Sequence, residues 1–255
     1  MERSQKVKPE TFQEDEYVFP YHYIPEVSAN QFSQVKNLSW GYLYLARLQR
    51  VVEIVRSWEF STLLDVGCGD GRLLHELHQA LPGMRLTGID FSDSPLRFAR
   101  AFNPDLEFIR GDIADDRSLI PQKYDVITLV EVIEHIPPEK LDAFIEAVSR
   151  RLNPSGRLLI TTPTDNIPVS KKHYQHFNLQ KLQGLLGDRF TITRTDYCHR
   201  PLSGLDRLKL RFLSNRLFVT VSPSFVSSFY RRYCARYFPA SPYDAADILI
   251  LCQKN

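Results

Sequence analysis

Short apolar runs alternate with amphipathic stretches along most of the chain, which is the pattern of a largely parallel sheet covered by helices. Strands are expected at residues 63–66, 85–90, 106–113, 124–130, 190–197 and 246–253, with one more ending at 161 after a proline–glycine turn. Helices are expected at residues 40–58, 72–81, 94–102, 139–152 and 179–186. The run 124–130 is nearly all apolar, so this strand should be buried on both faces. The pattern predicts an α/β fold.

A glycine-rich turn follows the first of these strands. The strand carries Asp65 near its end, and Gly67, Gly69 and Gly71 come next. Glycine is needed where the backbone adopts a positive φ or must approach a ligand without a Cβ in the way. A strand, a glycine turn and a helix start form a nucleotide-binding corner at the carboxyl edge of a parallel sheet. A dinucleotide site would need G-x-G-x-x-G, and this spacing departs from that pattern.

Two further carboxylates lie where the next strands end. Asp90 closes the second strand, 19 residues beyond Gly71, where a carboxylate can accept hydrogen bonds from a ribose diol. Asp112 follows Gly111 near the end of the third strand. The order of these features predicts a nucleoside site at one edge of the sheet.

Together these landmarks resemble the class I S-adenosylmethionine-dependent methyltransferases, over roughly residues 40–198 plus the last strand. The resemblance implies a Rossmann-like, mostly parallel seven-stranded sheet with helices on both faces. It also implies S-adenosyl-L-methionine as cofactor and a first helix that covers the cofactor cleft. The residues that the resemblance assigns to the cofactor are Asp65, Gly67, Cys68, Gly69, Gly71, Asp90, Phe91, Asp112, Ile113 and Glu131.

Candidate catalytic residues follow the fourth and fifth strands. Methyl transfer is a direct displacement, for which alignment of the reactants supplies much of the rate. A hydroxyl acceptor must also lose its proton, and a positioned histidine can accept it. We favour His135 as this base, with His173 second and Glu131 beside them. The alternative is that the histidines only pack a turn and a loop.

The stretch from Glu131 to His135, with a later H-x-x-H-F, resembles bacterial small-molecule and ubiquinone-pathway O-methyltransferases. It also resembles metal-dependent small-RNA 2′-O-methyltransferases, in which the matching residues would be Glu131, Glu134, His135 and His173. Two carboxylates and two imidazoles suit Mg²⁺ or Mn²⁺. The sequence departs from the RNA family at Pro163-Thr164-Asp165. We therefore expect EDTA to change the activity little and leave the metal site open.

The chain is expected to form a single methyltransferase domain with four parts. These are an N-terminal lid or strap (1–37), the cofactor-binding core (38–199), an insertion (200–244) and the final strand (245–255). In the first part, prolines flank three aromatic residues within 19–25, which excludes a helix interior there. The first helix should precede the first strand.

The insertion between the last two strands is far longer than a hairpin and should form helices of its own. Phe225, Phe229, Tyr233 and Tyr237 recur every four residues and should pack inward. Arg231, Arg232 and Arg236 should face outward. This basic, aromatic segment could be a simple cap, a surface for anionic lipid or a phosphate-bearing acceptor, or a site for RNA.

Bulk composition adds little to this picture. The net charge is +2, and the four cysteines show no pairing or metal spacing. No apolar run approaches the roughly 18 residues of a membrane span, and the N-terminus lacks an apolar signal core. We expect a cytoplasmic protein with reduced thiols. Peripheral contact with the inner face of the membrane through 200–244 is the alternative.

The most favoured function is O-methylation of a small metabolite, sugar or lipid-linked acceptor. RNA 2′-O-methylation is the alternative among enzymes, and it needs the metal quartet. A cofactor-binding subunit without catalysis is the alternative from another class, because it would keep the same glycines and Asp90.

Overall fold

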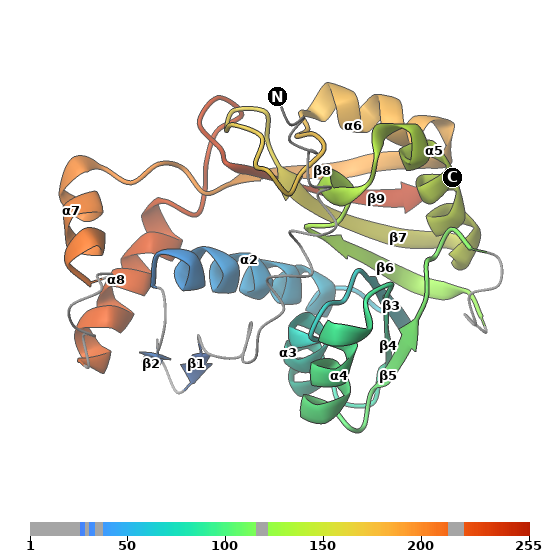
Figure 1. Cartoon of the computed structure of the whole chain (residues 1–255), viewed down its shortest axis with the longest axis horizontal. Coiled ribbons are helices and arrows are strands. Elements are labelled where there is room, and N and C mark those ends of the chain that lie inside the picture. Colours follow the sequence, from blue (N-terminus) through green and yellow to red (C-terminus); the bar gives the residue numbers. More distant parts are fainter. Residues whose placement is uncertain (1–25, 29–30, 34–37, 116–121, 214–221) are drawn as a thin grey trace, which may run out of the picture.

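The core of the protein is a seven-stranded sheet with the order β5-β4-β3-β6-β7-β9-β8 (Figure 1). The computed structural model describes residues 26–28, 31–33, 38–115, 122–213 and 222–255. The strands are β3 (Thr62–Val66), β4 (Arg85–Asp90), β5 (Glu107–Arg110), β6 (Tyr124–Val130), β7 (Leu152–Pro163), β8 (Phe190–Cys198) and β9 (Asp247–Lys254). The sheet is parallel from β5 to β7, and β9 runs antiparallel to both β7 and β8. The predicted Rossmann-like α/β architecture is confirmed.

Alternate residues of the strands supply two separate apolar layers, because successive side chains of a strand point to opposite faces. Leu63 faces the layer formed with α2, α3 and α4, whereas Leu64 faces the layer formed with α5 and α6. Both leucines are fully buried. The continuous apolar runs of the sequence therefore reflect strands that are covered on both sides.

The helices that cover the sheet lie close to their expected positions. They are α2 (Leu38–Arg56), α3 (Arg72–Ala80), α4 (Asp93–Phe102), α5 (Pro138–Arg151) and α6 (Leu179–Leu186). Helix α2 precedes the first strand of the large sheet, as predicted. None of the helices in the described part of the chain is long and apolar enough to cross a bilayer.

Two expectations differ from the structure at the level of strands. The third strand of the sheet is only Glu107–Arg110, shorter than 106–113, because the chain turns at Gly111-Asp112. Within the first 37 residues, β1 (Glu26–Ser28) and β2 (Gln31–Ser33) pair antiparallel rather than being irregular. The aromatic strap at 19–25 lies outside the described residues.

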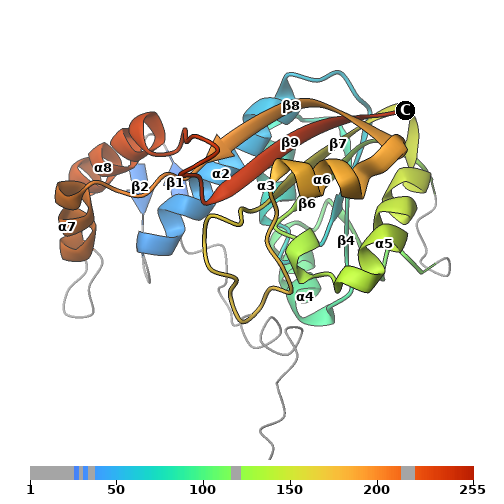
Figure 2. The same ribbon diagram turned by 90° about the horizontal axis from the view of Figure 1, so that it is seen from above.

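The insertion forms α7 (Gly204–Leu213) and α8 (Pro223–Arg236), which project beyond the sheet at the end of the molecule opposite α5 (Figures 1 and 2). Its aromatic residues pack against the amino-terminal half of α2, around Tyr42. The ring of Tyr42 lies 4.3 Å from that of Tyr233 and 5.8 Å from that of Phe229, measured between centroids. The inward packing is confirmed for Phe229, Tyr233 and Tyr237 but is wrong for Phe225, which is 46% exposed.

The outward direction of the three arginines of α8 is confirmed, since all are exposed. Two of them are nevertheless engaged within the insertion. The Nε of Arg232 lies 3.1 Å from Oδ2 of Asp206, and the guanidinium of Arg236 lies 5.7 Å from the ring centre of Tyr237.

Candidate functional site

The glycine turn between β3 and α3 has the backbone that only glycine adopts easily. Gly67, Gly69 and Gly71 have φ values of 72°, 55° and 77°. A Cβ on Gly67 would lie 2.7 Å from the side chain of Val132, so this turn also needs the space that glycine leaves. The positive φ values and the lack of space for a Cβ together explain the glycines. Without side chains here, the turn stays open toward the carboxyl edge of the sheet.

Asp90 at the end of β4 is fixed against this turn. One of its carboxylate oxygens accepts a hydrogen bond from the backbone N–H of Gly69, and the other accepts one from the N–H of Ser92, each at 2.9 Å. A carboxylate oxygen can accept more than one hydrogen bond, so both keep capacity for a ligand. This geometry suits the ribose role that the sequence assigns to Asp90.

A pocket opens beside Asp90 and the glycine turn. Six of the predicted cofactor residues line it, namely Gly67, Asp90, Phe91, Asp112, Ile113 and Glu131. His135 lines it as well, together with the apolar residues Val66, Ile89, Val132, Ile136 and Phe144. The pocket thus brings the cofactor candidates together with one of the two candidate bases.

Other predicted cofactor residues support the turn from beneath. Asp65 is buried and accepts a hydrogen bond of 2.7 Å from the hydroxyl of Thr128. Burial raises the pKa of Asp65 to about 7, and the nearby Asp90 adds to this effect. The thiol of Cys68 points toward β4, because a Cβ on Gly88 would lie 2.7 Å from its sulfur. The side chain of Cys68 therefore packs in the core, which differs from the expectation that this position faces the cofactor.

Glu131, directly after β6, belongs to a buried group that is paired internally. Its backbone has a φ of 59°, which is unusual for a residue other than glycine. One carboxylate oxygen accepts a hydrogen bond of 3.1 Å from Thr161, and the other lies 3.2 Å from Nη2 of Arg47. Burial raises the pKa of Glu131 to about 7, and the guanidinium of Arg47 opposes this rise.

Arg47 connects Glu131 to further side chains that do not line the pocket. Its guanidinium also pairs with Asp247, and Oδ2 of Asp247 lies 3.3 Å from Nε2 of His199. The other ring nitrogen of His199 is hydrogen-bonded to the hydroxyl of Tyr233 in the insertion. We name Arg47, Glu131, Asp247, His199 and Tyr233 the closed cluster. Burial lowers the pKa of Arg47, but Asp247 and Glu131 outweigh this effect and leave it raised.

The closed cluster also shows how α2 relates to the site. The expectation that this helix covers the cofactor cleft is met only in part. Helix α2 reaches the edge of the pocket through Arg47 and Glu131, and no α2 residue is among those found to line the pocket.

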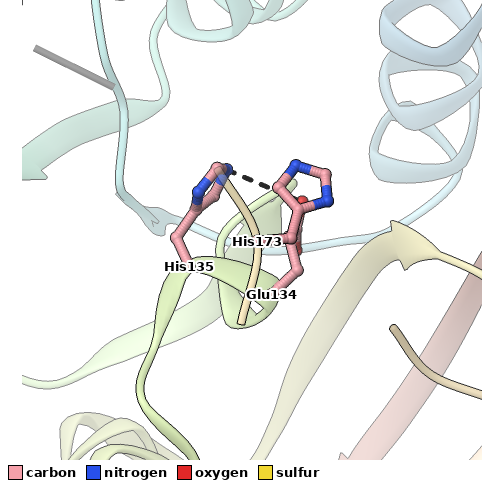
Figure 3. Close-up of side chains that lie close together, drawn as sticks. All are labelled: Glu134, His135 and His173. Atoms are coloured by element: carbon pink, nitrogen blue, oxygen red, sulfur yellow. Dashed lines mark ion pairs between the residues drawn. The ribbon is translucent and has the colours of Figure 1, made fainter. Parts of the chain in front are cut away.

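A second group, which we name the open cluster, contains the buried Glu134 and the half-buried His135 and His173 (Figure 3). One oxygen of Glu134 and one ring nitrogen of each histidine lie within 4.8 Å of one another. Nε2 of His135 lies 3.9 Å from Oε1 of Glu134, and the two imidazole rings meet edge to face at 4.8 Å. The three side chains therefore converge on one small volume.

Hydrogen bonds behind the open cluster fix which ring nitrogens remain available. Nδ1 of His135 lies 3.0 Å from the carbonyl oxygen of Lys172, which can only accept, so this nitrogen carries the proton. Nδ1 of His176 likewise donates to the carbonyl of Ile167 at 3.1 Å. The other nitrogen of His176 then accepts from Nδ1 of His173 at 2.8 Å. Both cluster histidines are left with a lone pair on Nε2.

The electrostatics keep these two histidines neutral. Burial lowers the pKa of His135, and the carbonyl of Lys172 only partly opposes this. Burial lowers the pKa of His173 to about 3, and its histidine neighbours add to the effect. Neutral imidazoles are good ligands but, at so low a pKa, His173 is a weak base.

Glu134 is the least satisfied member of the open cluster. Its side chain is fully buried, and one oxygen accepts a hydrogen bond of 3.1 Å from Thr162. The other, Oε1, has no hydrogen-bond partner among the described residues. Burial raises the pKa of Glu134 well above its usual range, and the neighbouring Glu131 adds to this. A carboxylate oxygen and two imidazole nitrogens match the donors that Mg²⁺, Mn²⁺ or a similar divalent cation accepts.

Glu131 is not part of the open cluster, although the resemblance to the small-RNA 2′-O-methyltransferases grouped it with Glu134, His135 and His173. Several supporting residues were not recognised from the sequence at all. These are Arg47, Thr162, His176, His199 and Asp247. The sequence H-x-x-H was the only signal for His176, and Arg47 looked like an ordinary polar position of an amphipathic helix.

Comparisons with known proteins agree with this geometry. Residues 64–158 match the family model of a methyltransferase domain. The chain is 34% identical over 124 residues to a ubiquinone biosynthesis O-methyltransferase of Vibrio atlanticus, covering 47% of this chain and 51% of the relative. It is 30% identical over 149 residues to the protein of the same name from Hydrogenovibrio crunogenus, covering 54% and 60%. The chain thus spans only about half the length of these curated relatives.

The fold extends further than the sequence similarity. The N-methyltransferase NodS of Bradyrhizobium japonicum, solved in complex with S-adenosyl-L-homocysteine, superposes with a TM-score of 0.61. The aligned region covers 97% of this chain and 99% of NodS at 14% identity, so it shows the fold alone.

The strand order and the glycine turn define a nucleoside-binding α/β domain of the Rossmann-like class. Within this fold, residues 64–158 match a methyltransferase domain, and the relatives that resemble the chain are named as O-methyltransferases.

Proposed function

We propose that this protein methylates a hydroxyl oxygen of a small acceptor. The observation that carries the proposal is the open cluster, which lies beside a cofactor pocket that His135 also lines. Amine acceptors need no such group of converging ligands, whereas a hydroxyl gains from being oriented and made more acidic. The acceptor class is a small metabolite, sugar or lipid-linked compound.

The residues of the pocket have separate tasks in this proposal. Bound S-adenosyl-L-methionine supplies an electrophilic methyl group. Asp90 holds the ribose end, while the glycine turn lets the backbone approach. Val132, Ile136 and Phe144 exclude water from the apolar side of the pocket. His135 stands at the border between this pocket and the open cluster, where the acceptor oxygen must lie.

The open cluster fits a divalent cation better than a free general base. Both histidines are neutral with Nε2 available, and buried Glu134 has one oxygen unpaired among the described residues. A cation held by Glu134, His135 and His173 would orient the acceptor hydroxyl and lower its pKa. It would also supply the counter-charge that a buried carboxylate requires. This preference differs from the sequence-based expectation of a metal-free base, and we now expect EDTA to abolish activity.

The relatives support an oxygen acceptor. Both curated relatives are named as ubiquinone biosynthesis O-methyltransferases, and the similarity extends over 124 and 149 residues. Whether this chain shares their substrate is a separate question, since it spans only about half their length.

RNA 2′-O-methylation is the second candidate, because the open cluster contains three of the four residues matched to that metal-dependent family. Against it, Glu131 pairs with Arg47 instead of joining the cluster. The exposed basic residues of the insertion also lie on α7 and α8, which are at the amino-terminal end of α2 and away from β3 and β4 (Figure 1). We therefore place a small acceptor first.

Incubation with S-[methyl-³H]adenosyl-L-methionine and fractionated cell extract tests these functions directly. Label in small metabolites or lipid, with Mn²⁺ restoring activity after EDTA, supports the proposal. Label in RNA would move the second candidate to the front. Binding of S-adenosylhomocysteine without any transfer would instead indicate a cofactor-binding subunit.

Cofactor binding has its own test. Asp90→Ala should weaken S-adenosylhomocysteine binding by about 1.5–3 kcal/mol, because hydrogen bonds to a charged group are lost. Isothermal titration measures this, with Asp105→Ala, a carboxylate in the loop after α4, as a control. No binding by the unmodified protein would contradict the assignment of the pocket.

A further inference from the structure

Helix α7 of the insertion has one face that packs against the protein. Asp206 and Leu213 are each 1% exposed, and Leu210 is partly buried between them in the helical repeat. The carboxylate of Asp206 accepts hydrogen bonds from Tyr237 and Arg232. This side of α7 is therefore held in place by apolar contacts and by the hydrogen bonds of Oδ2 of Asp206, whereas Oδ1 of Asp206 lies 3.7 Å from the ammonium of Lys209.

The opposite face of α7 carries large apolar side chains in solvent. Leu205, Leu208 and Phe212 are 77%, 65% and 62% exposed. Their spacing of three and four residues places them in one stripe along the helix. Single exposed leucines are ordinary on protein surfaces, but a contiguous stripe on a projecting helix indicates an interaction surface.

Basic residues flank this stripe. At 100° per residue, Lys209 lies on one side of the stripe and Arg211 on the other, and both are exposed. The insertion adds further exposed arginines at 207, 231 and 236. Asp206 is buried and pairs with Lys209 and Arg232, so it offsets part of this charge, and the remaining arginines keep the surface positive.

The apolar stripe and the basic residues beside it together distinguish between three classes of partner. A nucleic acid would match the basic residues but would leave Leu205 and Leu208 in water. An apolar groove of another protein would match the leucines but would gain nothing from the flanking charges. An anionic bilayer matches both, since apolar side chains enter the interface and basic ones meet phosphate groups.

We propose that α7 docks this protein on the surface of an anionic lipid bilayer. Leu205 and Leu208 insert at the boundary between headgroups and acyl chains, and Lys209 and Arg211 contact lipid phosphates. The contact surface is thus α7 rather than the α8 arginines that the sequence suggested. Arg232 and Lys209 both pair with Asp206, and Arg236 stacks on Tyr237, so the choice of α7 rests on its exposed apolar stripe.

Vesicle co-sedimentation tests this surface independently of methyl transfer. The unmodified protein should bind vesicles made of equal parts phosphatidylglycerol and phosphatidylcholine at low salt and should not bind phosphatidylcholine alone. Lys209→Glu with Arg211→Glu should weaken binding by about tenfold or more. Leu205→Ala with Leu208→Ala should weaken it similarly without any change in charge. Phe212 is left unchanged, because it also has contacts within the protein.

A matched pair controls for net charge. Lys123→Glu with Lys140→Glu reverses two exposed lysines, one just before β6 and one on α5, and should leave vesicle binding unchanged. Thermal melting and S-adenosylhomocysteine titration verify that each variant is folded. The proposal is overturned if the unmodified protein ignores acidic vesicles at low salt. It is also overturned if the control pair loses as much binding as the α7 pair, or if the leucine variant binds normally.

Discussion

The closed and open clusters lie at the same edge of the sheet, yet they treat buried charge in opposite ways. In the closed cluster, Arg47 lies between the carboxylates of Glu131 and Asp247. The side-chain contacts continue from Asp247 to His199 and from His199 to Tyr233. In the open cluster, Glu134 is fully buried with an oxygen that no described residue satisfies. In the closed cluster the carboxylates are paired with a cation of the protein, whereas the carboxylate of the open cluster has no such cation and is built to be completed from outside.

This difference separates stability from function. A buried ion pair is costly to break, because the remaining partner is left charged in a medium that solvates it poorly. A buried carboxylate without a partner is costly to keep and is retained where a ligand supplies the missing charge. Changes in the closed cluster should therefore unfold the protein, and changes in the open cluster should remove cation binding while leaving the fold intact.

The largest effect is expected at Arg47. Arg47→Met keeps most of the side-chain volume but leaves Glu131 and Asp247 without their shared cation, so unfolding should become easier by about 3–5 kcal/mol. Urea denaturation measures the change. Arg56→Met at the exposed end of α2 is the matched control and should have little effect. A loss below about 1 kcal/mol at Arg47 would mean that the closed cluster behaves like a surface pair.

The closed cluster should also be sensitive to acid through His199. Burial lowers its pKa from 6.5 to about 4, although the facing Asp247 opposes this and Arg47 reinforces it. The unfolded chain therefore binds the proton first, and stability is lost as the pH falls from 6.5 toward 4, by up to about 3 kcal/mol. His199→Asn tolerates the positive φ of this position and removes the effect. Denaturation at pH 7 and pH 5 should show a smaller difference for the variant, and equal differences would contradict the prediction.

In the open cluster, Glu134→Gln should separate the two properties. The amide keeps the shape but removes the charge, so Mn²⁺-dependent activity should fall by about 100-fold or more. The unfolding free energy in EDTA should change by less than about 1 kcal/mol, because the raised pKa of Glu134 favours a neutral carboxyl in the absence of a cation and an amide has nearly the same shape. Activity assays and melting with and without Mn²⁺ measure both. Glu139→Gln on the exposed surface of α5 is the control. Full activity of the Glu134 variant would return the metal-free base to first place.

The smallest effect is expected behind the open cluster, at His176. His176→Phe removes the acceptor that fixes the ring of His173, so cation affinity should fall by about 10–100-fold. Titration with Mn²⁺, followed by melting temperature, measures the change. His75→Phe alters a hydrogen-bonded histidine of α3 and should leave cation affinity unchanged. An unchanged affinity in the His176 variant would show that His173 needs no support from it.

Local pattern was sufficient for much of the fold and part of the site. The sequence predicted the strands around Leu64 and Ile127 and the three glycines of the turn. The periodicity of apolar residues, apolar runs and positive φ values are all properties of short segments. Asp90 was predictable as a pocket residue, because it ends a strand at the carboxyl edge of a parallel sheet, whereas Asp112 and Glu131 were assigned through the resemblance to the methyltransferases.

The error at Phe225 has a simple geometric cause. A spacing of four residues advances by roughly 40° per step relative to a helix of 3.6 residues per turn. Over the steps from Phe225 to Tyr237 the stripe therefore turns by roughly 120° around the helix. Phe225 is left exposed, and Val226 and Tyr230 take the inward positions.

By itself the sequence determined the class of this protein, because the glycine turn, the strand-end carboxylates and the paired histidines are each set by neighbouring residues. Tertiary structure alone decided which charges are paired. Arg47 and Asp247 are separated by 200 positions, and only the antiparallel placement of β9 beside β7 brings them together. That contact occupies Glu131 and leaves Glu134, His135 and His173 as the open group, because a buried guanidinium pairs with the carboxylates that the fold places within its reach.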